Sequence, residues 1–320
     1  MNHKVEKEGA TMEVTNFGEF KIYNEENKYS FLYADFDDED KFLRGLVSYI
    51  FDEENLLLYS KLSTGFKFKP GKREYVKLYK NISYFLNEEI MKIPVVDLDE
   101  ELERILDKEY ECLKGDDGKV LVKQDKVGKI GEYIFHLLLT RYFGYKCIIP
   151  KFRTTTDRNM SAFGIDTLFY DDEKSEILFG ESKFSKELSN GIKLVNHSLK
   201  YYEDNIKDEY LLVLSNDNFN LNTIFLDKYG EVIDVCSTFD DFIKESKINS
   251  VVIPIFIAHG DGNKNKIEKF IKKLSKINNN KMLGLETKYI LISLPIINKE
   301  KFCDFAIRMA VNKANEYKSK

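Results

Sequence analysis

The stretch that decides the fold runs from Gly164 to Phe184 and reads Gly164-Ile-Asp-Thr-Leu-Phe-Tyr-Asp-Asp-Glu-Lys-Ser-Glu-Ile-Leu-Phe-Gly-Glu-Ser-Lys-Phe184. It contains two apolar, strand-like runs, 164–170 and 177–184. The polar segment between them, residues 171–175, has the length and polarity of a hairpin connection. We therefore predict two paired strands over these residues.

The neighbouring segments extend this hairpin into a larger α/β unit. Residues 127–143 carry apolar side chains at nearly helical spacing, and a short strand is expected over 145–149. A helix is expected over about 186–206 and another strand over 209–215. The order α-β-β-β-α-β predicts an α/β fold with a mixed central sheet flanked by helices.

Charged residues interrupt the apolar runs at three places. Asp166 lies in the first run, and Glu181-Ser182-Lys183 lies in the second. Side chains two residues apart on a strand project from the same face, so Glu181 and Lys183 are expected to point together while Ser182 faces away. Asp166 reaches the same point if the two runs pair.

This arrangement fits metal-dependent phosphodiester hydrolysis. Such a reaction needs a divalent metal near the phosphate, and Mg²⁺ prefers hard oxygen ligands. Asp166 and Glu181 are the expected ligands of Mg²⁺, with Mn²⁺ as the alternative metal, and the backbone carbonyl of Ser182 could join them. Lys183 would orient the attacking water and stabilise charge on the phosphate. Glu132, near the start of the preceding helix, would supply an outer carboxylate or a further ligand.

A purely structural interpretation of the same residues is an ion pair between Glu181 and Lys183. Such a pair on a sheet contributes less than about 1 kcal/mol to stability. It leaves unexplained why charges interrupt the apolar run that begins at Ile177.

The element order resembles the common core of the PD-(D/E)xK (restriction-endonuclease-like) nuclease superfamily. Three segments further resemble the HamA family, over roughly residues 100–320: Gly131-Glu132, Gly164-Ile-Asp166 and Phe179-Gly-Glu-Ser-Lys183, together with the long loop 154–163. The resemblance implies an Mg²⁺-dependent deoxyribonuclease, the effector subunit of the Hachiman antiphage defence system. It also implies a superfamily 2 helicase partner (HamB-like) that senses damaged or invading DNA and licenses cutting.

Two other functions remain to be compared with this one. A subunit could keep the nuclease fold without activity and act as a DNA-binding or helicase-docking adaptor. A nucleotide-binding enzyme is disfavoured, because the Gly-x-x-x-x-Gly-Lys spacing of a phosphate loop is absent.

The chain is expected to divide near residue 118. Residues 1–118 read as an N-terminal α+β region, interpreted as partner-binding, with strands over 17–23 and 29–34 and helices over 37–51 and 97–113. Residues 119–320 form the nuclease domain. Its last elements are a strand over 251–258, where Pro254 suggests a sheet edge or a bulge, a strand over 288–296 and a helix over 299–317.

The loop before Asp166 offers candidate substrate contacts. Lys151, Arg153 and Arg158 would lie beside the metal site and could contact DNA phosphates. His136 falls within the helix of Glu132, where a core position, or one that supports the metal ligands, is favoured over metal ligation.

Composition limits the alternatives. The net charge of −5 argues against a protein that coats nucleic acid through bulk charge, although a nuclease needs only a local positive groove. The four cysteines have no metal-ligand spacing, and no apolar run is long enough to cross a bilayer. The charged N-terminus lacks a signal-peptide core, so we expect a cytoplasmic protein without a membrane partner.

Overall fold

The computed structural model describes residues 3–7, 10–17, 20–26, 30–35, 38–50, 93–95, 111–114, 120–123, 130–149, 167–171, 173–214, 223–236, 238–261, 272–278 and 280–296, with isolated positions between 52 and 312. In these ranges, no helix has both the length and the apolar character that a bilayer span requires.

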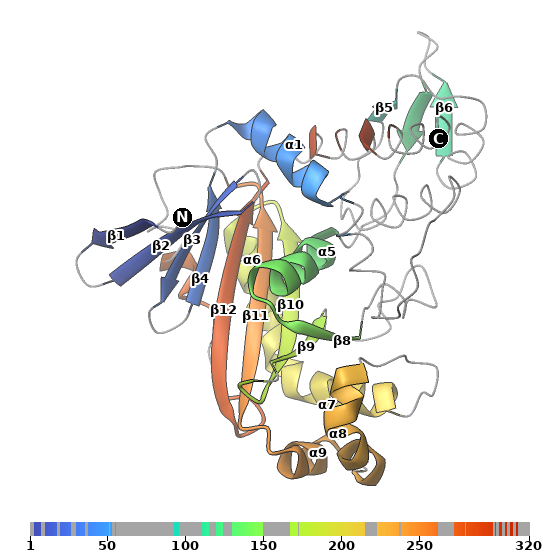
Figure 1. The fold of residues 1–320 in the computed structure, drawn as a ribbon. Helices are drawn as coiled ribbons and strands as arrows, with labels where there is room; N and C mark the ends of the chain where they lie inside the picture. Colours follow the sequence, from blue (N-terminus) through green and yellow to red (C-terminus); the bar gives the residue numbers. More distant parts are fainter. Residues whose placement is uncertain are drawn as a thin grey trace.

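The centre of the molecule is a mixed, nine-stranded sheet (Figure 1). The strand order across it is β1-β2-β3-β4-β12-β11-β10-β9-β8. Strands β4, β12, β11 and β10 are parallel to one another, and the remaining neighbours pair antiparallel. The strands are β1 (His3–Lys7), β2 (Ala10–Phe17), β3 (Phe20–Glu26), β4 (Ser30–Asp35), β8 (Lys146–Ile149), β9 (Thr167–Asp171), β10 (Glu176–Ser185), β11 (Ser250–His259) and β12 (Glu286–Pro295).

The predicted mixed sheet flanked by helices is confirmed. The helices are α1 (Glu39–Ile50), α5 (Ile130–Leu137), the π-helical turn η1 (Leu138–Tyr142), α6 (Leu188–Ser198), the 3₁₀ turn η3 (Leu199–Tyr201), α7 (Tyr202–Leu214), α8 (Thr223–Val235) and α9 (Phe239–Ser246). A separate three-stranded sheet has the order β5-β7-β6, from β5 (Ile93–Val95), β6 (Glu111–Lys114) and β7 (Val120–Lys123).

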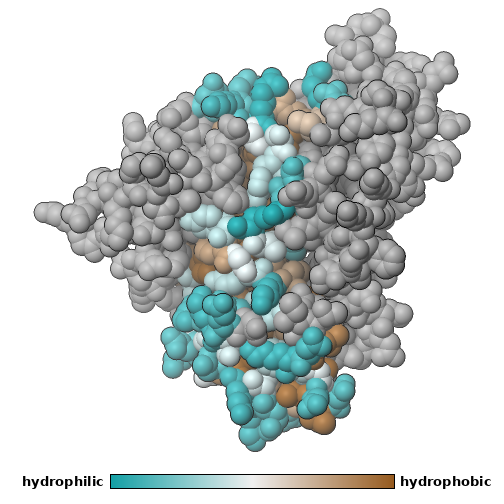
Figure 2. Space-filling view, viewed as in Figure 1, coloured by the Kyte–Doolittle hydropathy of each residue, from teal (hydrophilic) through white to brown (hydrophobic). Residues whose placement is uncertain are grey.

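Helices cover both faces of the parallel strands. On one face α5 packs against the sheet, where Phe135 stacks on Phe256 with ring centroids 5.6 Å apart. On the other face, side chains of α6 to α9 join the odd-numbered residues of β10 and β11 in one apolar cluster. Polar residues cover most of the surface over α8 and α9, with a few hydrophobic residues between them (Figure 2). Strand β10, which carries Glu181 and Lys183, is covered by α5 on one face and by α6 on the other.

The predicted hairpin is confirmed over its described residues, whereas residues 164–166 of the first predicted strand lie outside them. Strands β9 and β10 pair antiparallel from Asp171 opposite Glu176 to Thr167 opposite Gly180. In the turn between them, the Asp171 carboxylate accepts hydrogen bonds from the backbone N–H groups of Glu173 and Lys174. This side-chain capping is the usual way in which an aspartate stabilises a tight turn.

The N-terminal predictions are confirmed in part. The strand predicted over 17–23 matches β3, although Phe17 ends β2, and the strand predicted over 29–34 matches β4. Helix α1 covers the predicted helix, with Phe42, Leu43 and Leu46 on its buried face. Strand β4 then pairs with β12 from the far end of the chain. One sheet therefore contains strands from both sides of residue 118, and the division into units and the partner-binding role stay predictions.

Two secondary-structure predictions are wrong. The predicted strand over 209–215 is helical through Leu214, because α7 continues without a Gly or Pro to end it. A short apolar run of this kind does not distinguish strand from helix by periodicity alone. The end of the predicted helix 97–113 is also wrong, since residues 111–113 belong to β6, where cross-strand pairing with β7 decides the conformation.

The strand over 251–258 is confirmed, but Pro254 marks neither the sheet edge nor the bulge that were predicted as alternatives, so that part of the prediction is wrong. Strand β11 lies inside the sheet, with β10 on one side and β12 on the other. Its pairing with β12 is continuous through Pro254, opposite Ile290. Strand β12 matches the last predicted strand, and the described positions from 301 to 312 are helical, as expected for the closing helix.

Candidate functional site

The centre of the candidate site is a glutamate–lysine pair on β10. The ammonium group of Lys183 forms an ion pair with the Glu181 carboxylate. Glu181 is only 2% exposed, whereas Lys183 is 26% exposed and reaches the surface. The structure therefore brings these two predicted catalytic residues together on one face, as their spacing predicts.

The sheet explains why Glu181 is buried. It lies opposite Ile255 of β11, and Lys183 lies opposite Ile257, so both side chains project among apolar neighbours on the face that α6 covers. A carboxylate in such surroundings requires a cation or hydrogen-bond donors to remain charged. Lys183 supplies one cation.

The other predicted site residues are placed less completely. Ser182 is half-buried and, by strand alternation, faces the side of the sheet that carries Phe256. Glu132 belongs to α5, which packs on that same side, but its side chain lies outside the described residues. Asp166 and the three basic residues Lys151, Arg153 and Arg158 also lie outside them.

The described pairing of β9 with β10 nevertheless ends only one residue before Asp166. The last described pair of β9 and β10 joins Thr167 to Gly180, the residue directly before Glu181.

The pairing of β10 with β11 has a gap just before Glu181. The paired positions stop at Leu178 opposite Val252 and resume at Glu181 opposite Ile255, with no change of register. Pro254 lies in this gap and has no amide hydrogen to donate. In a parallel ladder of this register, the amide of residue 254 would bond to the carbonyl of Phe179.

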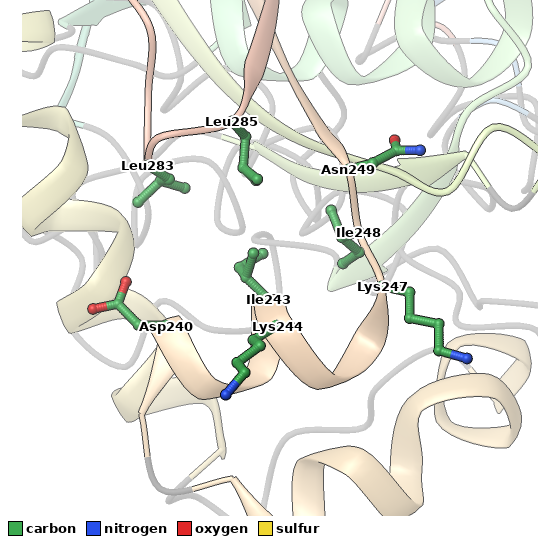
Figure 3. Close-up of a pocket in the computed structure, with 8 residues that line it drawn as sticks. All are labelled: Asp240, Ile243, Lys244, Lys247, Ile248, Asn249, Leu283 and Leu285. Atoms are coloured by element: carbon green, nitrogen blue, oxygen red, sulfur yellow. The ribbon is translucent and has the colours of Figure 1, made fainter.

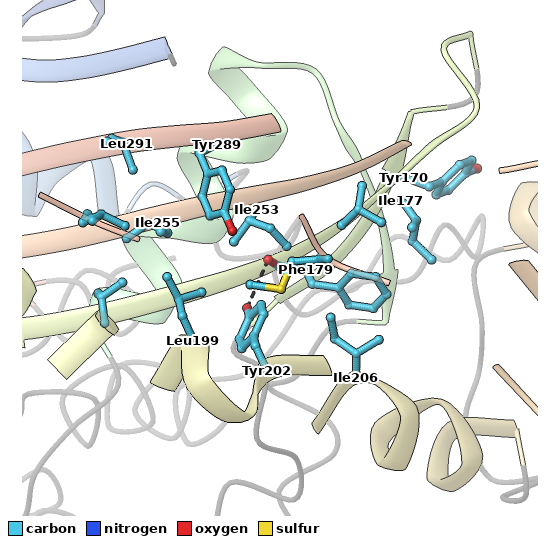
Figure 4. Close-up of a cluster of buried hydrophobic side chains, with 14 of the residues drawn as sticks. Tyr170, Ile177, Phe179, Leu199, Tyr202, Ile206, Ile253, Ile255, Tyr289 and Leu291 are labelled. Carbon is cyan, nitrogen blue, oxygen red and sulfur yellow. Dashed lines mark hydrogen bonds between the residues drawn. The ribbon is translucent and has the colours of Figure 1, made fainter. Parts of the chain in front are cut away.

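A tyrosine hydroxyl takes the place of the missing amide. Tyr202, at the start of α7, is fully buried, and its Oη donates a hydrogen bond to the Phe179 carbonyl at 3.1 Å (Figure 4). Sequence reasoning missed Tyr202. The local signal for it was Pro254 inside a long apolar strand sequence, because a proline in a paired strand leaves a carbonyl acceptor in need of another donor.

Polar groups also gather at the carboxyl ends of the parallel strands. His259 Nε2 and Ser293 Oγ are 2.7 Å apart, and burial lowers the pKa of His259 to about 4. Asp261 accepts a hydrogen bond from Lys273 at 3.0 Å. The carboxyl ends of parallel strands are where α/β proteins commonly bind ligands.

His136 occupies the core position that was predicted. It is buried in α5, 5.2 Å from the ring of Phe169, and burial lowers its pKa to about 3. A neutral histidine packed against an aromatic ring stabilises the helix–sheet contact.

A second buried glutamate lies at the other end of β10. Glu176 is 4% exposed, forms an ion pair with Lys288 and accepts a hydrogen bond from Ser250 Oγ at 3.1 Å. It links the amino-terminal parts of three parallel strands and provides a structural counterpart to Glu181.

A pocket of about 490 Å³ lies near the amino ends of β11 and β12 (Figure 3). It is lined by α9 and the segments that lead into the two strands: Asp240, Ile243, Lys244, Lys247, Ile248, Asn249, Leu283 and Leu285. Ile248 is seven residues from the partner of Glu181, roughly 20 Å along the strand at 3.3 Å per residue. The pocket is therefore separate from the candidate site.

The donor set fits a hard divalent cation only in part. Across the part of the chain that the structure describes, no group of three or more Asp, Glu, His or Cys side chains is arranged to hold a metal. Glu181 is the one predicted metal-ligand carboxylate whose side chain is described, and buried carboxylate oxygens are ligands that Mg²⁺ accepts.

Comparison with known proteins identifies the family of the chain. No curated protein and no solved structure matches the chain. The family model described as HamA matches residues 13–310 and so includes β10 and both neighbouring strands. Because that match spans nearly the whole sequence, the chain belongs to the HamA family.

Proposed function

We propose that this chain is a metal-dependent DNA nuclease of the PD-(D/E)xK type and the effector subunit of a Hachiman antiphage defence complex. Membership of the HamA family supports the defence role. The observation that carries the catalytic proposal is the buried Glu181 paired with Lys183 on one face of β10.

The proposed metal site combines residues of two strands. Continued by one residue, the β9–β10 register would put Asp166 opposite Glu181, and opposite residues of an antiparallel pair share a face. Asp166, Glu181 and the Ser182 carbonyl would then hold Mg²⁺ or Mn²⁺. Glu132 belongs to α5, which packs on the opposite face of the sheet from Glu181, so it is not included in this ligand set. The ion, when bound, supplies positive charge at the phosphate and lowers the pKa of water.

The protein side chains would share the remaining work of hydrolysis. A water oxygen bonds to phosphorus while a phosphorus–oxygen bond of the DNA backbone breaks, and the water proton ends on the leaving oxygen. Lys183 is exposed enough to reach a substrate phosphate while its ammonium group stays beside Glu181. It would hold the water in line and stabilise charge on the phosphate oxygens.

DNA and a helicase are the proposed partners. The basic residues Lys151, Arg153 and Arg158 would contact the DNA backbone, where lysine and arginine bind phosphate without reading sequence. A superfamily 2 helicase subunit would license cutting.

A second candidate function is a catalytically silent adaptor with the nuclease fold. The observation that favours it is that Lys183 already balances the buried charge of Glu181. An adaptor would keep this ion pair for stability and bind DNA or the helicase without cutting.

The test is cleavage of supercoiled and linear DNA with Mg²⁺ or EDTA, with and without the proposed superfamily 2 helicase subunit. Wild-type protein should cut only with Mg²⁺, and Lys183→Ala should not cut. Lys288→Ala is the matched control, since it removes the lysine partner of the buried Glu176 and should keep activity.

Two results would contradict the proposal. Cleavage by Lys183→Ala at the wild-type rate removes the catalytic role of the pair. Absence of cleavage by wild type with the helicase present, together with retained helicase binding, establishes the adaptor.

A further inference from the structure

We infer that Tyr202 is a positioning residue for Glu181: its hydroxyl replaces the strand hydrogen bond that Pro254 cannot make and so fixes β10 directly before the metal-binding carboxylate. This inference rests on the proposed function, since it assigns Tyr202 to the site that would hold the metal.

The gap in the pairing of β10 with β11 lies directly before Glu181. Between β10 and β11, the pairs at Phe179 opposite Ile253 and at Gly180 opposite Pro254 are missing, while those on both sides keep one register. A register shift would leave an offset, and there is none. The missing amide of Pro254 is therefore a sufficient cause of the gap.

The carbonyl of Phe179 is the acceptor that lacks a strand partner at this gap. In this register the amide of residue 254 would bond to the Phe179 carbonyl, and that carbonyl accepts the Tyr202 hydroxyl instead. An unsatisfied buried carbonyl is destabilising, so the tyrosine makes a proline tolerable inside the sheet. Proline is otherwise confined to edges and bulges.

The donor, Tyr202, is held in place by the packing around it. Tyr202 is fully buried in the apolar cluster between α6, α7 and the sheet, next to Leu199 and Ile206 (Figure 4). Its ring cannot swing away without opening this cluster. The hydroxyl therefore holds the Phe179 backbone against α7 at a fixed place.

The Tyr202 hydrogen bond acts on the part of β10 that carries Glu181. Phe179 and Glu181 are two residues apart on one strand, so their side chains share a face. Directly before Gly180 and Glu181, the ladder between β10 and β11 lacks the bond to the Phe179 carbonyl. Without the tyrosine bond this carbonyl would have no donor from the proline, and the Glu181 carboxylate would be held less tightly.

The experiment measures Mn²⁺ binding by electron paramagnetic resonance on the full chain, alongside cleavage. Tyr202→Phe removes one oxygen and keeps the ring. We expect about three- to tenfold weaker Mn²⁺ binding, the effect of losing one buried hydrogen bond at the site. The Mg²⁺ concentration for half-maximal cleavage should rise by a similar factor.

The matched control is Tyr289→Phe. Tyr289 is also buried, and its hydroxyl donates to the carbonyl of Asn280 at 2.8 Å, near the amino end of β12. Both variants lose one tyrosine-to-backbone hydrogen bond and should lower the melting temperature alike. Only Tyr202→Phe should change metal binding.

A compensating variant separates positioning from general loss of stability. Tyr202→Phe combined with Pro254→Ala returns an amide hydrogen opposite the Phe179 carbonyl. The double variant should bind Mn²⁺ more tightly than Tyr202→Phe alone. A Tyr202→Phe variant that binds Mn²⁺ as Tyr289→Phe does would overturn the inference while leaving the nuclease intact. Wild-type protein that neither binds Mn²⁺ nor cuts DNA with the helicase present overturns both.

Discussion

Glu176 and Glu181 are two almost fully buried carboxylates of one strand, and each forms an ion pair with a lysine. Glu176 links the amino ends of three strands through Ser250 and Lys288, whereas Glu181 lies where the β9–β10 register would continue to Asp166. The two residues have the same chemistry and burial but different proposed roles, which makes them a matched pair for experiment.

Replacing each glutamate by glutamine separates metal binding from stability. Glu181→Gln should abolish the stabilisation by Mn²⁺, which for wild type is about 2.7 kcal/mol at a hundredfold excess over Kd. Glu176→Gln should lower the melting temperature but keep the Mn²⁺ effect, because its partners are structural. Thermal unfolding with and without Mn²⁺ measures both. An unchanged Mn²⁺ effect in Glu181→Gln would remove Glu181 from the proposed ligand set.

Gly191 of α6 allows that helix to approach the face of the sheet that carries Glu181. A Cβ at residue 191 would lie 2.5 Å from Ile257 Cγ2 and 3.0 Å from Ser185 Oγ. Gly191→Ala should therefore destabilise the fold by about 1–3 kcal/mol through overpacking. Denaturant unfolding measures the change.

Gly230 in α8 is the control for that substitution. A Cβ there has no neighbour within 4 Å, so Gly230→Ala should be neutral or stabilise by up to about 1 kcal/mol through helix propensity. Equal destabilisation by both substitutions would show that close packing of α6 is not the cause.

The protein should become less stable as the pH falls, because it contains buried histidines. Burial lowers the pKa of His136 to about 3 from its ordinary value of 6.5, so between these values only the unfolded state binds the proton. The contribution is fully present above pH 6.5 and is lost as the pH falls towards 3. The unfolding free energy should decrease by up to about 1.4 kcal/mol per pH unit from this residue.

His136→Phe keeps an aromatic ring beside Phe169 and removes the titrating group. Urea unfolding between pH 7.5 and 4.5 should show a smaller slope in the variant. The slope should not vanish, because burial also lowers the pKa of His259 to about 4. Identical slopes for wild type and variant would contradict the assignment.

The end of α9 carries a backbone conformation that favours glycine. Lys247 terminates the helix with φ of 58°, a left-handed conformation, and its side chain is exposed. Lys247→Gly should stabilise the protein by roughly 0.5–1 kcal/mol. Lys244→Gly, inside the same helix, should instead destabilise it by about 1 kcal/mol. Chemical unfolding of the two variants compares them, and a destabilising Lys247→Gly would show that the lysine side chain contributes to the cap.

The sequence by itself determined the features that depend on neighbouring residues. The polar turn at 171–175 predicts the β9–β10 hairpin, and the two-residue period of a strand predicts that Glu181 and Lys183 share a face. Acidic residues at the start and an apolar stripe predict α1. Each of these patterns acts within one element or one turn, where local steric preference and burial dominate.

Only the tertiary structure decided the features that depend on distant partners. Residues 209–214 are apolar enough for a strand but continue α7, and residues 111–113 form a strand because β7 pairs with them. Pro254 lies inside the sheet, against the rule that its sequence suggests, because Tyr202 donates the hydrogen bond that the proline cannot. The reason is physical: a buried polar backbone group must find a partner, and that partner can come from anywhere in the chain.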